Sequence, residues 1–390
     1  MRYINQSGAY LNLSTALLSL LTNKNKRKIY ILGIIYCLVI TQLGHCGGIK
    51  IINDVKLRSI DLLNSLRHRS GLFGASTLSC QTGYDKAWIR DNIYIALGIE
   101  TFDIEAAIRV YHALFDILLK HEYKIDWAIR EKPDTRFKYI HARFNPITLD
   151  EFHDEWGNKQ NDAIGAFLFK VGELENRGIK VIRSEADLRI LLKLVLYLES
   201  IEYWHDKDNG VWEENEEAHA SSIGACVAGL RSISSIIPVP EKLIKKGEDV
   251  LNALLPSESV TRQADLALLS LIYPYNVVSG ARRSAILANV ERLLVRDHGV
   301  IRYVGDQYYA NEHGEAEWTM GFPWLAIIFK TLGNKEKYDY YVQKTMMVMN
   351  ENGELPELYF AGTDEHNENS PLGWAQAMCM VAISESQEIT

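Results

Sequence analysis

The sequence predicts an all-α protein whose helices close into a double ring. Three observations support this fold class. Apolar residues recur at helical spacing in about twelve stretches from about residue 50 onward. Strand patterns are scarce, and "GVIRYV" at 299–304 is the best short one. No sequence repeat of about 34 or 40 residues is visible, which argues against a standard solenoid.

The helical stretches follow one another with turn signals between several of them. We expect helices at 55–66, 89–99, 104–119, 161–174, 185–203, 220–236, 241–254, 263–272, 281–295, 318–332, 335–349 and 372–383. Six inner and six outer helices fit this count. Four long connections, at 124–160, 205–218, 300–317 and 350–371, carry polar and aromatic residues. We therefore expect one helical domain over 50–390, with functional groups in loops above a rigid scaffold.

Composition excludes some functions and leaves others open. The 390 residues are 47% hydrophobic and 10% aromatic, which is enough for a large core. The net charge of -8 comes from 42 basic and 50 acidic residues, and no basic stripe indicates a nucleic-acid partner. The 8 Trp and 20 Tyr residues would suit sugar rings beside carboxylates, and they would equally suit an ordinary core.

The cysteines and histidines indicate neither a disulfide framework nor a metal site. No pair of the cysteines has metal-ligand spacing, and their number is odd. The cysteines are Cys37, Cys46, Cys80, Cys226 and Cys379. The 11 His residues form no HExxH-like cluster. We expect buried, reduced thiols and no metal or cofactor.

An apolar segment stands apart near the N-terminus. The basic stretch "KNKRK" at 24–28 precedes an apolar run at 29–43. This order is typical of a signal peptide or a membrane anchor, although the run is short for a span of about 20 residues. We interpret 1–49 as an N-terminal extension and favour export or anchoring. A cytoplasmic protein with a buried extension or a start site placed too far upstream is the alternative.

Two clusters precede the middle of the chain. "YDKAWIRDN" at 84–92 contains Trp88, Arg90 and Asp91, which would serve as a core residue and a helix start, or as a clamp on sugar hydroxyls. "DEWGNKQND" at 154–162 provides helix-capping residues, and its Trp156 would alternatively form a pocket wall.

Two further clusters carry glutamates. "DNGVWEENEEAHASS" at 208–222 is either a solvated acidic loop or the site of a general acid, because the aromatic face of Trp212 would raise the pKa of a neighbouring carboxyl. "NGELPELYF" at 352–360 places Glu357 among apolar residues. That carboxylate is either part of a turn or functional, since a buried one must be paired, protonated or used.

Taken together, the motifs resemble glycoside hydrolase family 15, which contains glucoamylases and glucodextranases. The motifs "WIRD", "EWGNKQND", "GVWEE", "GVIRYVGDQYY", "FPWLAII", "LPELY" and "LGWAQA" occur in the family's order between about residues 66 and 382. They are also similar to the glucoamylase-like region of phosphorylase kinase regulatory subunits. The resemblance implies the (α/α)6 toroid, in agreement with the helix count.

By position, the resemblance makes Glu213 the general acid and Glu357 the general base. The substrate-binding residues that it implies are Trp88, Arg90, Asp91, Trp156, Trp212, Glu214, Arg302, Asp306, Tyr308 and Tyr309. The family's "WGRPQRD" motif is replaced by "WGNKQND", in which only Lys159 is basic. An inverting glycosidase holds its two carboxyl groups about 6.5–9.5 Å apart, with room for the attacking water.

Three functions follow as expectations from this resemblance. The first is an inverting exo-acting hydrolase that releases glucose from the non-reducing ends of α-linked gluco-oligosaccharides. The second is a glucan- or oligosaccharide-binding regulatory protein with little or no catalysis. The third is another (α/α)6 glycosidase, such as a trehalase. The expected ligand is an α-linked gluco-oligosaccharide or polysaccharide, and the sequence does not fix the linkage.

Overall fold

The computed structural model describes residues 44–154 and 156–384. The described part of the chain divides into two units between Leu57 and Arg58. The boundary lies inside helix α3 (Gly44–Ser65), whose first residues are the described part of the first unit. Helix α3 therefore begins before residue 50, where the sequence places the start of the helical domain. All other described elements belong to the second unit.

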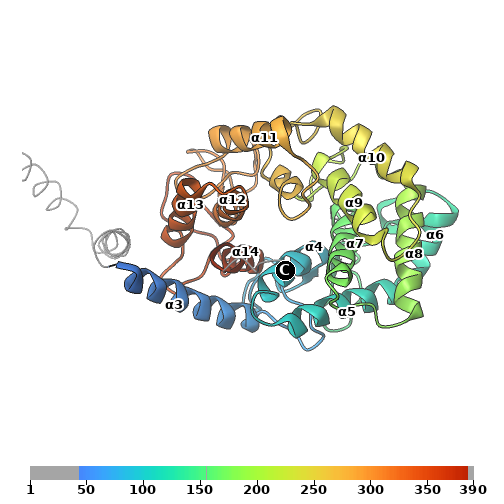
Figure 1. Ribbon diagram of the computed structural model, residues 1–390, viewed down its shortest axis with the longest axis horizontal. Helices are drawn as coiled ribbons and strands as arrows, with labels where there is room; N and C mark the ends of the chain where they lie inside the picture. Colours follow the sequence, from blue (N-terminus) through green and yellow to red (C-terminus); the bar gives the residue numbers. More distant parts are fainter. Residues whose placement is uncertain (1–43, 155, 385–390) are drawn as a thin grey trace, which may run out of the picture. The chain divides into compact units, whose positions relative to one another are not determined.

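Within the second unit the helices form an (α/α)6 toroid, which confirms the predicted fold class (Figure 1). The inner ring of its described part consists of α4 (Ile89–Ile99), α7 (Asn161–Asn176), α9 (Ala220–Ile233), the 3-10 helix η2 (Leu266–Leu271), α12 (Gly321–Thr331) and α14 (Gly373–Ile383). The outer ring consists of the end of α3, then α5 (Ile104–Lys120), α8 (Glu185–Ser200), α10 (Glu241–Leu254), α11 (Gly280–Leu293) and α13 (Lys335–Met347). A short helix, α6 (Glu122–Arg130), packs beside α8.

The apolar pattern of each helix explains whether it lies in the inner or the outer ring. Every residue of α4 is buried, and α12 and α14 are buried along almost all of their lengths. A helix that is apolar on all faces belongs inside a protein. In contrast, α10 buries only Leu243, Gly247 and Leu251, which are four residues apart and form one stripe. The outer helices thus cover the inner ring with one face and leave the other in water.

Small residues allow the inner helices to approach closely. A Cβ atom added to Gly98 of α4 would lie 2.6 Å from the Cα of Ala377 in α14. One added to Gly165 of α7 would lie 2.4 Å from the backbone carbon of Ala225 in α9. Real side-chain carbons do not come so near to backbone, so these crossings require glycine.

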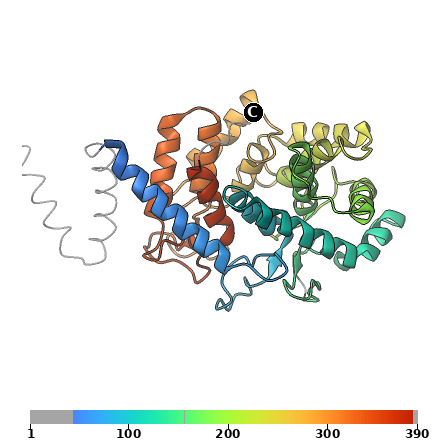
Figure 2. The ribbon, with the colours of Figure 1, turned by 60° about the horizontal axis from the view of Figure 1, so that its bottom comes forward.

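The loops before the inner helices gather at one end of the ring. Figure 2 shows the loop after α3 and the loop between α13 and α14 on the same side of the helices. Two short sheets order these loops. Strand β1 (Ala87–Trp88) pairs with β2 (Arg143–Phe144), and β3 (Glu317–Trp318) pairs with β4 (Leu358–Tyr359), both antiparallel.

The sequence-based boundaries were accurate for most helices, and several expectations were wrong. The stretch 263–272 is the short 3-10 helix η2 rather than an α-helix. Helix α6 begins at Glu122 and covers the first part of the stretch expected to be a loop, 124–160. The pattern at 299–304 makes isolated bridges, from Val300 to Val295 and Trp318, instead of a regular strand. Residue Trp318 itself belongs to β3, so α12 begins three residues later than predicted.

The predicted apolar segment at 29–43 lies outside the described residues. Among the residues that the structure describes, no helix combines the length and apolar character needed to cross a bilayer. The cysteines whose side chains the structure describes are buried free thiols, as expected. They are Cys80, Cys226 and Cys379.

Candidate active site

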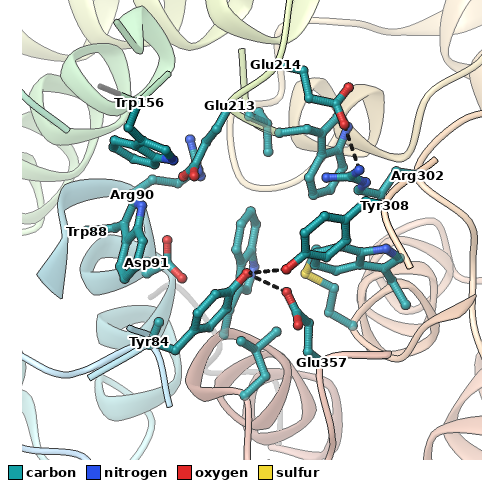
Figure 3. Close-up of a pocket in the computed structure, with 17 residues that line it drawn as sticks. Tyr84, Trp88, Arg90, Asp91, Trp156, Glu213, Glu214, Arg302, Tyr308 and Glu357 are labelled. Atoms are coloured by element: carbon teal, nitrogen blue, oxygen red, sulfur yellow. Dashed lines mark hydrogen bonds and ion pairs between the residues drawn. The ribbon is translucent and has the colours of Figure 1, made fainter. Parts of the chain in front are cut away.

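A cavity of about 230 Å³ lies where the loops meet the N-terminal ends of inner helices. Ten of the residues selected from the sequence line it: Trp88, Arg90, Asp91, Trp156, Trp212, Glu213, Glu214, Arg302, Tyr308 and Glu357. Figure 3 shows all of these except Trp212 as labelled side chains around one open space. The remaining lining residues are Ala75, Tyr84, Val211, Trp318, Met320, Leu372 and Trp374. The fold therefore assembles residues from five separate loops into one site.

Aromatic rings form much of the cavity wall. The rings of Trp88 and Trp156 meet edge to face with 6.0 Å between centroids, and those of Trp212 and Trp318 lie 5.5 Å apart. The Trp212 indole N–H donates to Asp265 Oδ1 at 2.8 Å, which fixes this ring in the wall. Flat apolar walls with a few convergent polar groups are the usual make-up of a small-ligand site.

The loop that carries Glu213 is held in a tight conformation. Glu213 has φ +64° and Gly210 has φ +62°, both in the left-handed region. A non-glycine residue there costs about 1–3 kcal/mol, and such residues concentrate at functional sites. The loop closes on itself through an antiparallel bridge between Asp208 and Glu217. Glu213 is thereby turned into the cavity.

Burial gives Glu213 the ionisation of a candidate acid. Loss of hydration raises the pKa of the Glu213 carboxyl to about 7, with Arg90 opposing the rise and Asp91 adding to it. The Nη2 atom of Arg90 lies 3.1 Å from Oε1 of Glu213. A carboxyl that stays protonated near neutral pH is able to give its proton to a leaving group.

Arg90 is the centre of a buried polar group at the start of α4. Its Nη1 donates to Gln160 Oε1 at 2.8 Å and to Asp162 Oδ2 at 3.1 Å, both near the start of α7. Burial raises the pKa of the neighbouring Asp91 to about 6, and Arg90 opposes the rise. Arg90 thus spans two inner helices and the acid loop, and presents a fixed cation to the cavity.

The second glutamate of the pair is engaged by cations. Oε1 of Glu214 accepts from Arg302 Nη2 at 2.7 Å, and Oε2 accepts from the Tyr303 hydroxyl at 2.6 Å and from Arg262. Arg302 is held in turn by Asp306, at 2.6 Å through both Nε and Nη2. Glu214 and Arg302 therefore form a rigid charged edge of the cavity.

Glu357 is fully buried and lies immediately before β4. Its Oε1 accepts from the Tyr84 hydroxyl at 2.6 Å, and its Oε2 accepts from the amide groups of Asn369, at 2.7 Å, and Asn367. Burial raises the pKa of Glu357, while the hydrogen bonds from Tyr84 and the two asparagines lower it. These three donors stabilise the charged form in a site that otherwise disfavours it.

Two of the sequence-selected residues do not line the cavity. Asp306 is 0% exposed and lies behind Arg302. Tyr309 packs edge to face on Tyr308, with 4.7 Å between ring centroids, and is 37% exposed. Lys159 also points elsewhere, since it is buried against Asp206 at 3.0 Å. These three side chains would act on a ligand only through their neighbours.

Other cavity residues were not selected from the sequence. Tyr84 begins the quoted stretch "YDKAWIRDN", Trp318 begins a predicted helix and Trp374 lies in "LGWAQA". Asn367 and Asn369, which bind Glu357, lie in the predicted polar loop at 350–371. These aromatic and amide residues could have been found from the sequence, because they lie within or beside the motifs already singled out.

The arrangement is suited to acid–base chemistry. Figure 3 shows Glu213 and Glu357 reaching the same open space from different loops. Glu213 is poised to be protonated near neutrality, and Glu357 is held by donors that favour its charge. One acid and one base on either side of a bound bond are what glycoside hydrolysis requires.

Comparison with known sequences identifies the family. Residues 51–254 match the sequence profile of glycosyl hydrolases family 15. The chain belongs to this family. It is also similar to the skeletal muscle isoform of phosphorylase b kinase regulatory subunit alpha from Oryctolagus cuniculus. That alignment is 23% identical and covers 83% of this chain and 30% of the relative. The chain thus spans less than a third of the length of that relative.

Solved structures share the fold of this family 15 chain. A glycosidase variant in complex with glucose aligns with TM-score 0.76 and 18% identity, over 87% of this chain and 97% of that one. Glucoamylase from Saccharomycopsis fibuligera aligns with TM-score 0.63 and 15% identity, over 86% and 94% of the two chains. At these identities the likeness establishes the toroid and no more.

Proposed function

We propose that this protein is an inverting, exo-acting α-glucoside hydrolase that releases glucose from non-reducing ends. The observation that carries the proposal is the pairing of Glu213 and Glu357 across one aromatic-walled cavity. Membership of glycosyl hydrolases family 15 supports hydrolysis as the reaction class. The glucose bound to a glycosidase of the same fold supports a glucose-containing substrate.

The size of the cavity supports action at a chain end. Its volume of about 230 Å³ is below the range of about 300–1,000 Å³ that is common for ligand sites. Such a space suits one terminal sugar unit. Arg90 and Asp91 would hold hydroxyl groups of that unit, and Glu214 with Arg302 would contact the next one.

In the proposed reaction, the protonated Glu213 gives its proton to the glycosidic oxygen as the bond to C1 breaks. Ionised Glu357 takes a proton from a water molecule, whose oxygen attacks C1 from the opposite face. Proton transfer by each positioned carboxyl contributes about 10²–10⁴-fold to the rate. The inversion follows from direct attack by water.

A second function has a specific observation in its favour. Curated relatives of this chain include regulatory subunits of phosphorylase b kinase, and one of them aligns with 83% of this chain. In a regulatory protein the cavity would bind a glucan or oligosaccharide without rapid cleavage. The presence of both carboxyl groups, with their hydrogen bonds intact, favours the hydrolase.

A substrate panel tests the two functions together. Purified protein is incubated with maltotriose, maltoheptaose, isomaltotriose and trehalose, and glucose is measured over time. Release from one of the linear α-glucans, absent in Glu213→Gln protein, is the expected result. Calorimetric binding without release on every substrate would support the regulatory function. Cleavage of trehalose alone would indicate the trehalase-like alternative.

We also propose export or membrane anchoring through the apolar stretch at 29–43. The support is its basic flank at 24–28. Fractionation of the native host tests this proposal, because protein found only in the cytoplasm would contradict it.

A further inference from the structure

The two carboxylate oxygens of Glu357 have different surroundings. Oε2 accepts two amide hydrogen bonds, from Nδ2 of Asn367 and from Nδ2 of Asn369 at 2.7 Å. Oε1 accepts one, from the hydroxyl of Tyr84 at 2.6 Å. Each carboxylate oxygen offers two lone-pair positions. Both lone-pair positions of Oε2 are therefore occupied. Oε1 retains one free lone-pair position beside Tyr84, which lines the cavity.

The backbone places both asparagines against Glu357. The N–H of Glu357 donates to the carbonyl of Asn369 at 2.9 Å, and the N–H of Asn367 donates to the carbonyl of Leu358 at 3.2 Å. The register of this antiparallel contact brings the two side chains to the same carboxylate oxygen. Neither asparagine lines the cavity itself.

A second set of contacts fixes the orientation of one amide. Oδ1 of Asn369 accepts from the hydroxyl of Thr82 and from the thiol of Cys80 at 3.2 Å. With its oxygen bound to those donors, Asn369 must present its N–H group to Glu357. The loop that carries Tyr84 thus supports the carboxylate directly and through Asn369.

We infer that Asn367 and Asn369 are positioning residues that assign Oε1 of Glu357 as the proton acceptor and set the lower pH limit of hydrolysis. The inference rests on the proposed hydrolase function. As water attacks C1, its O–H bond breaks and Oε1 takes the proton. The new C1–O bond forms, the glycosidic C1–O bond breaks, and the leaving oxygen gains the proton of Glu213.

The electrostatic surroundings agree with this role. The charged and titratable groups that act on Glu357 or are acted on by it include Tyr84, Asp91, Arg302, Tyr308 and Tyr309. The positive charge of Arg302 lowers the pKa of Glu357, and burial outweighs it by raising that pKa. The uncharged amides then contribute much of what keeps this carboxylate ionised at acidic pH.

The test is the pH profile of kcat/KM for Asn367→Ala and Asn369→Ala in the full chain. Each substitution removes one donor from the charged form, so the acidic limb moves upward by about one pH unit. Movement of this limb, and not a uniform loss across the pH range, is the result that the inference predicts. The matched control is Asn311→Ala. Asn311 is exposed, and its amide donates to the carbonyl of Ala361, which lies on the loop that carries Asn367 and Asn369. Its acidic limb stays at the wild-type position.

A measurement without turnover separates this inference from the proposed function. Protein labelled with ¹³C at glutamate carboxyl groups is titrated by NMR, and the resonance missing from Glu357→Gln protein is assigned to Glu357. Its midpoint moves upward in both asparagine variants. Should an alanine variant fail to fold, Thr82→Val offers a milder change. It removes one of the two donors to Oδ1 of Asn369 and shifts the midpoint in the same direction.

Two results would overturn the inference. One is a Glu357 midpoint and an acidic limb that stay within about 0.2 pH unit of wild type in folded variants, which is far below the expected shift. The other is a uniform loss of activity at all pH values with no movement of the limb, as a purely structural role predicts. Absence of any hydrolysis would reject the proposed function instead. The NMR midpoint would still show whether Asn367 and Asn369 stabilise the ionised form of Glu357.

Discussion

Nη2 of Arg90 lies 3.1 Å from Oε1 of Glu213, so the start of α4 binds the candidate acid directly. The Arg90 side chain is buried, the Glu213 side chain is 20% exposed, and two opposing effects act on the acid. Burial raises the pKa of Glu213 to about 7, and the guanidinium lowers it from what burial alone would give. The position of this cation therefore sets the pH at which the acid loses its proton.

Replacement of Arg90 by Ala tests that balance. Without the cation, the pKa of Glu213 rises further, and the basic limb of kcat/KM moves upward by about one pH unit or more. Loss of charged hydrogen bonds to substrate also weakens binding by about tenfold or more. The pH profile and calorimetric titration with a slowly cleaved oligosaccharide measure the two effects. Arg136→Ala, which removes an exposed partner of Glu216 outside the cavity, is the control. A basic limb that moves downward would contradict the assignment.

Replacement of Glu213 by Gln removes the proposed acid and keeps its shape. Turnover falls by about 10²–10⁴-fold, and the basic limb disappears from the residual activity. Glu216→Gln serves as the matched control, because Glu216 lies exposed on the same loop. Near wild-type turnover in Glu213→Gln protein, with the control equally active, would remove Glu213 from the mechanism.

The same variant makes a prediction about stability. The pKa of Glu213 in the folded protein, about 7, lies above its ordinary value of 4.5. The folded protein thus binds more protons than the unfolded chain between these values, and its stability falls as pH rises through this window. Glu213→Gln lacks this dependence. Its melting temperature, relative to wild type, is expected to be higher at pH 8 than at pH 5, as scanning calorimetry would show.

The sequence predicted the helices best where one apolar pattern decided the outcome. The helices at 89–99 and 241–254 were predicted to the residue. Helix α6 was missed because it has only nine residues and buries Lys124, which pairs with Glu151 at 2.6 Å. All six side chains of η2 are buried, so this apolar stretch was predicted to be part of an α-helix. The Asp265 side chain caps it at Ala267, and Pro274 follows closely.

The site was predictable where a motif carried several of its groups together. Arg90 with Asp91, and Trp212 with Glu213 and Glu214, follow from local sequence. Tyr84 binds Glu357 from 273 positions away, and only the closed ring brings them together. The placement of Asp306 behind Arg302 likewise depends on which side of a buried ion pair faces the cavity. A single sequence does not show which partner of the ion pair faces the cavity.

Replacement of Glu357 by Gln tests the base and the stereochemistry. Loss of the base lowers turnover by about 10²–10⁴-fold and removes the acidic limb from what activity remains. In wild-type protein, NMR of fresh digests of an α-linked substrate shows β-glucose first, because water attacks the face opposite to the leaving group. Appearance of α-glucose first would indicate retention and a different role for Glu357. Wild-type activity in the Gln variant would make Glu357 a structural turn residue.

Replacement of Asp306 by Ala separates support of the site from contact with the ligand. Asp306 is fully buried and binds Arg302 at 2.6 Å through each oxygen, and its Oδ1 also accepts from the backbone N–H of Tyr308. Removing one partner of a buried ion pair costs about 3–5 kcal/mol, since the other charge remains without compensation. Glu214 still binds Arg302, so the loss is expected near the lower end of that range.

The free energy of unfolding, measured with denaturant, checks this loss, and kinetics check its effect on the cavity. Released from Asp306, Arg302 no longer holds one orientation, so KM rises by about tenfold or more while the pH limits set by Glu213 and Glu357 stay in place. Asp249→Ala is the matched control, because its pair with Lys245 is exposed and such pairs contribute about 0–1 kcal/mol. An Asp306→Ala protein as stable as this control, with an unchanged KM, would show that Arg302 holds its position without the buried carboxylate.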